Sequence, residues 1–176
     1  SSLEKTISFI EIFLRYPIHR ISSIYLWPKI LNKICGGRLR FPISGGGAIA
    51  PHIDSFFEAL GVELLVGYGL TETSPVLTCR RPWRNIRGGS GQPLPETEIK
   101  IVDPETFQIK KLRQKGLVLA RGPQIMSGYL GKISESKKVL DSTGWFNTGD
   151  LGMLLSDGSL ILTGRAKDTI VLSSGE

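Results

Sequence analysis

Apolar residues recur at helical spacing in the first part of the chain, between residues 3 and 35. Pro17 and Pro28 interrupt this pattern, and proline cannot continue a helix, so we expect about three short helices there. Alternating apolar residues then predict a strand over residues 39–43, which ends at the loop formed by residues 44–47.

A helix and a second strand are predicted next. Pro51 occupies a first helical position, and apolar residues follow it at spacings of three, four and seven, which predicts a helix over residues 51–60. Residues 62–66 read as an apolar strand that opens into Gly67-Tyr68-Gly69. A strand, a helix and a strand in about 28 residues are typical of a parallel crossover unit. Open α/β sheets bind ligands at the carboxyl ends of such strands.

The pattern changes from Cys79 onward, where helical periodicity disappears and short strands alternate with turns. Asp157-Gly158 is a tight-hairpin signal. The predicted fold class is therefore α/β plus β: a parallel α/β unit followed by a small antiparallel β-barrel-like or sandwich subdomain. The predicted strands are 98–102, 116–120, 152–155 and 159–162, and another begins at 169–172. The chain reads as cut at both ends.

The composition indicates a folded protein with a core. Of the 176 residues, 40% are hydrophobic and 22% are charged, which excludes a disordered chain. Cys35 and Cys79 are too few for a disulfide framework, so we expect reduced thiols in a cytoplasm-like compartment. The two histidines, His19 and His52, are isolated, which gives little support to a zinc or serine-hydrolase centre.

The net charge of +6 is concentrated near the start of the chain. Residues 1–40 hold seven Lys or Arg and two Glu, so they carry 7 − 2 = +5. Such a region suits an acidic partner, either a membrane surface, an acidic carrier protein or nucleic acid, but it also fits a solvated helix face. We find no signal-peptide pattern and no run of about 20 apolar residues. The longest candidate, 18–34, is interrupted by charges, so we expect peripheral membrane contact at most.

Gly45-Gly46-Gly47-Ala48-Ile49-Ala50 fits a dinucleotide-binding fingerprint between a strand and a helix. A dehydrogenase would need an acidic residue at the end of the next strand to bind a ribose. That strand ends Leu65-Val66-Gly67, so the dehydrogenase interpretation is disfavoured.

Residues 67–75, Gly-Tyr-Gly-Leu-Thr-Glu-Thr-Ser-Pro, hold the densest candidate chemistry. The ring of Tyr68 could stack on a flat base, and the hydroxyls of Thr71 and Thr73 could donate to phosphate oxygens. A lone carboxylate, Glu72, could hold Mg²⁺ while substrate phosphates supply other ligands.

This segment resembles the YGLTET-type motif of the adenylate-forming superfamily, which includes acyl-CoA synthetases, luciferases and peptide-synthetase adenylation domains. Three further segments agree in order: residues 121–129 resemble GP-x-x-M-x-GY, 144–150 resemble GW-x-x-TGD, and 164–168 resemble GR-x-K-D. The resemblance covers about residues 35–176. It implies part of the large N-terminal domain of such an enzyme, ending at the hinge to the C-terminal domain. The implied regions are a helical segment with the α/β part (1–78), a β-rich subdomain (79–164), and the hinge with the start of a truncated C-terminal domain (165–176).

The resemblance also implies cofactors and site residues. It implies ATP and Mg²⁺, with Thr71 at the α-phosphate, Glu72 at the metal as the other catalytic residue, and Lys167 at the hinge. Asp150 and Arg165 would hold the ribose hydroxyls. The adenine would be framed by Ser44, Gly45, Gly46, Gly47, Gly67, Tyr68 and Gly69, with Tyr68 against its face.

Residues 37–41, together with residues 69–73, resemble the long-chain fatty-acid branch of this superfamily, and residues 165–176 are similar to the acyl carrier protein synthetases of cyanobacteria and plastids. The implied activity is ATP-dependent ligation of a long-chain fatty acid through acyl-AMP to acyl carrier protein, in a cyanobacterial cell or plastid, with no nucleic-acid partner. Coenzyme A as the acceptor and a non-catalytic nucleotide-binding module stay as alternatives. The family's phosphate loop and downstream lysine are absent from residues 1–176, so we expect this stretch alone to be inactive.

Overall fold

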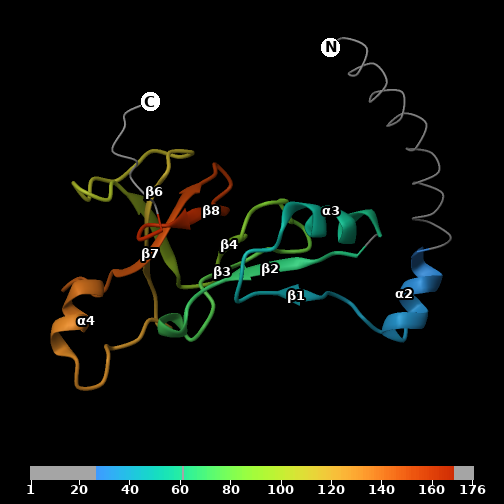
Figure 1. Ribbon diagram of the computed structural model, residues 1–176, viewed down its shortest axis with the longest axis horizontal. Coiled ribbons are helices and arrows are strands. Elements are labelled where there is room, and N and C mark those ends of the chain that lie inside the picture. The colour runs from blue at the N-terminus through green and yellow to red at the C-terminus, as the bar shows by residue number, and fades with distance from the viewer. Residues whose placement is uncertain (1–26, 61, 169–176) are drawn as a thin grey trace, which may run out of the picture. The chain divides into compact units, whose positions relative to one another are not determined.

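The computed structural model describes residues 27–60 and 62–168 (Figure 1). Contacts divide the chain into two units, and each is described by itself. The first is Ser1–Pro42 with Ala50–Leu64, and the second is Ile43–Ile49 with Leu65–Glu176.

The first unit contains two described helices, α2 (Trp27–Cys35) and α3 (Pro51–Ala59). Proline stands at the start of α3, where its missing N–H costs nothing, and the Ala50 carbonyl accepts the first N–H groups of the helix. The helix predicted over residues 51–60 is thus confirmed to within one residue. Of the helices predicted over residues 3–35, only α2 lies among the described residues.

The first sheet of the second unit has four short strands in the order β1-β2-β3-β4. They are β1 (Ile43–Ser44), β2 (Leu65–Tyr68), β3 (Thr78–Cys79) and β4 (Gln92–Pro93). The first pair is parallel, which confirms the predicted crossover connection, and the other two pairs are antiparallel.

The strand bounds in this sheet differ from those predicted. Residues 39–42 are not a strand, because β1 finds its parallel partner only from Leu65 onward. Residues 62–64 are the connection that follows α3 and not a strand, and the Val62 N–H still donates to the Phe57 carbonyl of that helix. In return, β2 runs on through Gly67 and Tyr68, since these residues pair with β3.

The second sheet is antiparallel, with the order β5-β6-β7-β8. Its strands are β5 (Glu98–Val102), β6 (Gly116–Arg121), β7 (Phe146–Leu154) and β8 (Leu160–Arg165). The predicted strands in this half are confirmed, and the one predicted over residues 152–155 is the end of a longer strand. Asp157-Gly158 turns the chain between β7 and β8, with Gly158 at φ +83°. The strand predicted at 169–172 lies outside the described residues.

One apolar core joins the two sheets of the second unit. Tyr68 and Leu77 from the first sheet region pack in the same cluster as Val118 and Leu160 from the second sheet. Backbone bonds reinforce the junction, because the Leu160 N–H donates to the Gly91 carbonyl at 2.9 Å. The sheets therefore hold the end of β2 against β7 and β8. The predicted boundary between residues 78 and 79 falls inside β3, and the division into 1–78, 79–164 and 165–176 stays a prediction.

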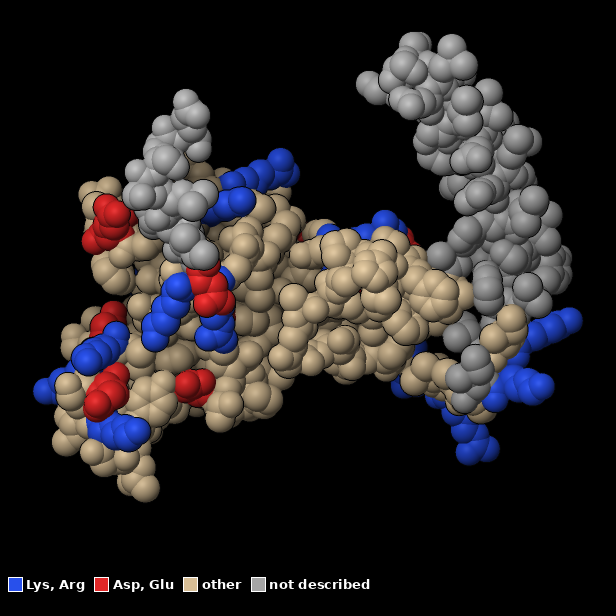
Figure 2. Space-filling model, in the orientation of Figure 1, with Lys and Arg blue, Asp and Glu red and all other residues tan. Residues whose placement is uncertain are grey.

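Charges are distributed differently over the two units. Figure 2 shows Lys and Arg side chains gathered around α2 and the segment after it, where the sequence has Lys29, Lys33, Arg38 and Arg40. On the same view, acidic and basic side chains alternate over the second sheet and over the helix α4 (Ile133–Val139). Among the described helices, none combines the length and the apolar character needed to cross a bilayer.

Candidate functional site

A buried carboxylate, Asp150, is the centre of the candidate site. It alternates with Phe146 and Thr148 on the buried face of β7, so the strand itself turns the side chain inward. The Asp150 N–H donates to the Thr148 hydroxyl oxygen, and that hydroxyl donates to the Val118 carbonyl. Both bonds tie the carboxylate's backbone to the sheet core.

Both oxygens of Asp150 have partners from other strands. The Tyr68 hydroxyl donates to Oδ2 at 2.6 Å, and Arg165 Nε lies 2.9 Å from Oδ1. Arg165 faces Asp150 across the β7–β8 ladder, whereas Tyr68 comes from the end of β2, 82 residues earlier. The structure thus brings together three residues that the sequence motifs placed far apart.

This group combines a buried anion, Asp150, with a largely exposed cation, Arg165. Asp150 is 6% exposed, and a buried carboxylate needs such partners. The Arg165 side chain is 56% exposed, so its guanidinium group lies partly at the surface. Burial, and then the hydrogen bond to Asp150, raise the pKa of Tyr68, so its hydroxyl stays a donor at neutral pH.

The glycine-bearing loop 45–47 that follows β1 lies beside the end of β2, which contains Gly67 and Tyr68. A Cβ on Gly45 would be 3.5 Å from the Gly67 carbonyl oxygen, and residues 45–47 are exposed. Ser44, at the end of β1, is half-buried. Gly69 has a different role, because a Cβ there would overlap the Pro75 carbonyl group. Its small size allows the segment after β2 to fold back on itself.

Thr73 organises the short 3₁₀ helix η1 (Thr71–Thr73) that follows. Its fully buried hydroxyl oxygen accepts the Leu70 N–H at 2.9 Å and lies within hydrogen-bond distance of two carbonyl oxygens, those of Leu70 and Pro75. Of the two hydroxyls that the sequence suggested as phosphate donors, Thr73 is therefore committed to the backbone. Thr71 is exposed and remains able to donate.

Glu72 is held from a second segment, residues 126–129. The Tyr129 hydroxyl donates to Glu72 Oε1 at 2.9 Å, and the Met126 N–H donates to the Glu72 carbonyl oxygen at 2.9 Å. Sequence reasoning gave Tyr129 no role in the site. The available signal was the end of the Gly122–Tyr129 motif, where an aromatic hydroxyl follows a glycine.

The donor set fits Mg²⁺ only when a substrate supplies further ligands. Within the described ranges, no three His, Cys, Asp or Glu residues gather into a metal cluster. Magnesium commonly binds one or two carboxylates together with substrate phosphates, and Glu72 beside the exposed Thr71 suits that mode.

Lys167 lies apart from these contacts, in the turn that follows β8, with its side chain exposed. The Ala166 N–H donates to the Gly149 carbonyl and the Asp168 N–H to the Arg165 carbonyl, so this turn begins directly after Arg165 and is bonded to the strand that carries Asp150. Its predicted role as a hinge stays a prediction, as do the ligand contacts of the other site residues.

Comparison with known proteins identifies a family. Residues 17–130 match the AMP-binding enzymes. The chain is similar to the chloroplastic long-chain-fatty-acid–acyl-carrier-protein ligase of Arabidopsis thaliana, with 46% identity over 93% of this chain. It is 36% identical, over 88% of its length, to long-chain-fatty-acid–CoA ligase 1 of Schizosaccharomyces pombe. The matched parts are 24% of each relative, so the chain spans about a quarter of their length.

A solved structure agrees with this match. ATP-bound MatB from Rhodopseudomonas palustris has a TM-score of 0.71 and 29% identity, covering 75% of this chain and 26% of that protein. The predicted fold class is confirmed by this likeness together with the mixed and antiparallel sheets.

Proposed function

This chain belongs to the family of AMP-binding enzymes, and we propose on that basis that it forms the nucleotide-binding part of an ATP-dependent long-chain fatty-acid ligase. The observation that carries the proposal is the group formed by Asp150, Tyr68 and Arg165, in which Tyr68 stands at the end of β2. A carboxylate oxygen has more than one lone pair, so Asp150 can accept ribose hydroxyls while it keeps both present partners. Arg165, which pairs with Asp150 and is 56% exposed, lies next to the same sugar in this scheme.

The proposed reaction has two steps. A fatty carboxylate attacks the α-phosphorus of ATP, the bond to pyrophosphate breaks, and acyl-AMP forms. A thiol then attacks the acyl carbon and AMP leaves. In this scheme Thr71 donates to the α-phosphate, and Glu72 holds Mg²⁺, which when bound neutralises charge on the phosphates. The adenine lies against the 44–47 loop and Gly67-Tyr68-Gly69, and Lys167 marks the pivot between the two steps.

Acyl carrier protein is the thiol acceptor that we favour. The relative described as an acyl-carrier-protein ligase is 46% identical, against 36% for a CoA ligase. Carrier proteins are acidic, and the four Lys and Arg between residues 29 and 40 would complement them. The same charges suit an anionic membrane surface. The alternative that we propose for them is therefore peripheral membrane contact in a plastid or cyanobacterial cell.

The full-length gene product tests the proposal directly. We expect it to exchange labelled pyrophosphate into ATP only when a long-chain fatty acid is present. We also expect it to form thioester faster with holo acyl carrier protein than with coenzyme A. Faster thioester formation with coenzyme A would identify the CoA-ligase alternative. Binding of ATP without any exchange would instead identify a non-catalytic nucleotide-binding module.

A further inference from the structure

Tyr129 contacts a residue of the proposed site that is far from it in the sequence. Its hydroxyl donates to Glu72 Oε1 at 2.9 Å across a separation of 57 residues. A second contact reinforces the first, because the Met126 N–H donates to the Glu72 carbonyl. The side chain and the backbone of Glu72 are therefore both held by residues 126–129.

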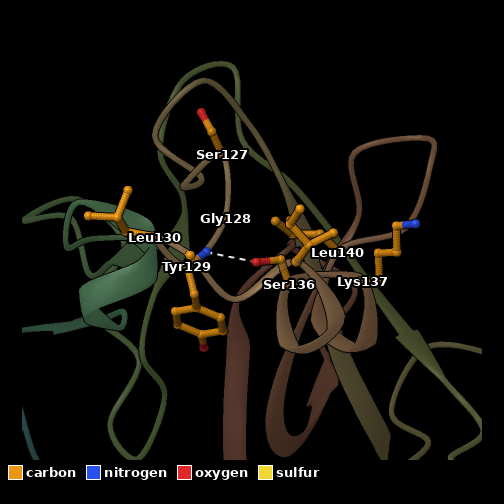
Figure 3. Close-up of a pocket in the computed structure, with 9 residues that line it drawn as sticks. Ser127, Gly128, Tyr129, Leu130, Ser136, Lys137 and Leu140 are labelled. Atoms are coloured by element: carbon orange, nitrogen blue, oxygen red, sulfur yellow. Dashed lines mark hydrogen bonds between the residues drawn. The ribbon is translucent and has the colours of Figure 1, made fainter.

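The segment that carries Tyr129 is itself fixed by the helix α4 (Ile133–Val139). The Ser136 hydroxyl oxygen accepts the Tyr129 N–H at 2.8 Å, and the Ser136 hydroxyl donates to the Lys132 carbonyl. Gly128 adopts φ +144°, and a Cβ there would press on Ser136 Oγ at 3.0 Å. Figure 3 shows the Tyr129 backbone facing Ser136 while its ring points away from that helix. The hydrogen bond to Ser136 on α4 therefore fixes the backbone from which the Tyr129 ring extends. The hydrogen bond to Glu72 fixes the position of the Tyr129 hydroxyl.

These contacts determine which oxygen of Glu72 is available. Oε1 accepts the Tyr129 hydroxyl, whereas Oε2 accepts no hydrogen bond from the described part of the chain. A tyrosine hydroxyl is neutral, so it orients the carboxylate without cancelling its charge.

We propose that Tyr129, fixed by Ser136 on α4, is a positioning residue that presents Glu72 to the metal of the bound nucleotide. This inference rests on the proposed function, since it takes Glu72 as the metal-binding carboxylate. Residues that orient a metal-binding carboxylate usually change metal affinity about 10-fold or more when they are removed. Tyr129 touches neither the substrate nor the reacting atoms in this scheme.

The coupling between ATP and Mg²⁺ tests the proposal without measuring turnover. The affinity of the full-length gene product for ATP is measured with Mg²⁺ and with EDTA, in the absence of fatty acid. The ratio of the two dissociation constants reports how strongly the protein holds the metal with the nucleotide. We expect Tyr129→Phe to reduce this ratio about 10-fold and to have little further effect in a Glu72→Gln background.

Thr143→Val is the matched control, because it also removes a hydroxyl that donates to a carboxylate, Asp141 Oδ1, at 2.8 Å on the surface. It should leave the ratio unchanged. Ser136→Ala is the second variant: it keeps the hydroxyl of Tyr129 but releases the turn, and should lower the ratio in the same direction. An unchanged ratio in Tyr129→Phe, with or without a lower melting temperature, would overturn the inference.

Failure of the inference and failure of the proposed function give different results. A ratio of one in the wild type would mean that ATP binds equally well with Mg²⁺ and with EDTA, so that no protein group contacts the metal. This result would overturn the inference even if pyrophosphate exchange is normal. A ratio that falls in Tyr129→Phe in a protein without pyrophosphate exchange would support the inference and contradict the ligase.

Discussion

The hydrogen bond from the Tyr68 hydroxyl to Asp150 should contribute to the free energy of unfolding. It is buried, 2.6 Å long, and pairs an oxygen of a carboxylate that is only 6% exposed. Tyr68→Phe leaves that oxygen without its donor, so we expect the free energy of unfolding to fall by about 1–3 kcal/mol. Urea unfolding at neutral pH measures the loss. The same substitution at the half-buried Tyr129 is the control and should cost clearly less.

The pH dependence of this effect has a definite sign. Burial, and then the Asp150 hydrogen bond, raise the folded-state pKa of Tyr68 above the ordinary value of about 10. The stabilisation is therefore complete below about pH 10 and is lost as the pH rises toward the folded-state pKa. The gap between wild type and Tyr68→Phe should narrow above pH 10. A gap that stays constant or widens would show that the hydroxyl is not held as a neutral donor.

At the level of residues, the sequence identified most members of the candidate site but not how they interact. Asp150 and Arg165 stand in separate motifs, and only their register in β7 and β8 pairs them. The contacts of Tyr68 and Tyr129 join residues that are 82 and 57 positions apart in the sequence. At such separations, motif spacing gives no information about which side chains lie close together. Thr73 was predicted to donate to a phosphate because it carries a hydroxyl. The sequence does not show that this hydroxyl is already hydrogen-bonded to the backbone.

Among the elements, Gly91 marks the junction of the two sheets. It adopts φ +81°, and a Cβ there would overlap the backbone of Cys79 and Arg80. Its carbonyl also accepts the Leu160 N–H, which begins β8. We expect Gly91→Ala to lower the free energy of unfolding by about 3 kcal/mol, through backbone strain and overpacking together.

Gly88→Ala separates these two causes. Gly88 has a similar φ of +76°, but a Cβ there meets no atom within 4 Å. Its substitution should therefore cost only about 1 kcal/mol, the strain of the left-handed backbone. Urea unfolding of both variants gives the comparison. Equal losses would mean that the close approach at the junction contributes nothing.

Strands were predictable where their partners are long and regular. Residues 98–102 match β5 in full, because a five-residue apolar alternation lies in a ladder with β6. The bounds of β1 and β2 were wrong by one to four residues, since hydrogen bonds to partners decide where a short strand begins and ends. The helix α4 was missed: its seven residues include none that is buried, so no apolar periodicity marks it.

For the whole molecule, the second unit contains the residues proposed for one side of the nucleotide site. Its shared core brings the end of β2 to β7 and β8, so the residues proposed for the ribose and for the metal belong to one folded unit. The residues expected to hold the outer phosphates, in a Ser, Thr and Gly-rich loop, and the lysine expected to assist adenylation, do not occur in residues 1–176. The chain matches about a quarter of its relatives, which is consistent with those parts lying elsewhere in them.

We therefore expect residues 1–176 alone to form no acyl-AMP. Without groups to bind the outer phosphates, the charge that develops on pyrophosphate as it leaves has no counterpart from the protein, and such electrostatic stabilisation is a large part of catalysis. Trapping of acyl-AMP by hydroxylamine, with MgATP and a long-chain fatty acid, measures this, with the full-length gene product as the positive control. An Asp150→Ala form of residues 1–176 sets the background, because it lacks the central carboxylate. Acyl-AMP above that background would contradict the prediction and would show that the groups within this chain suffice for the first step.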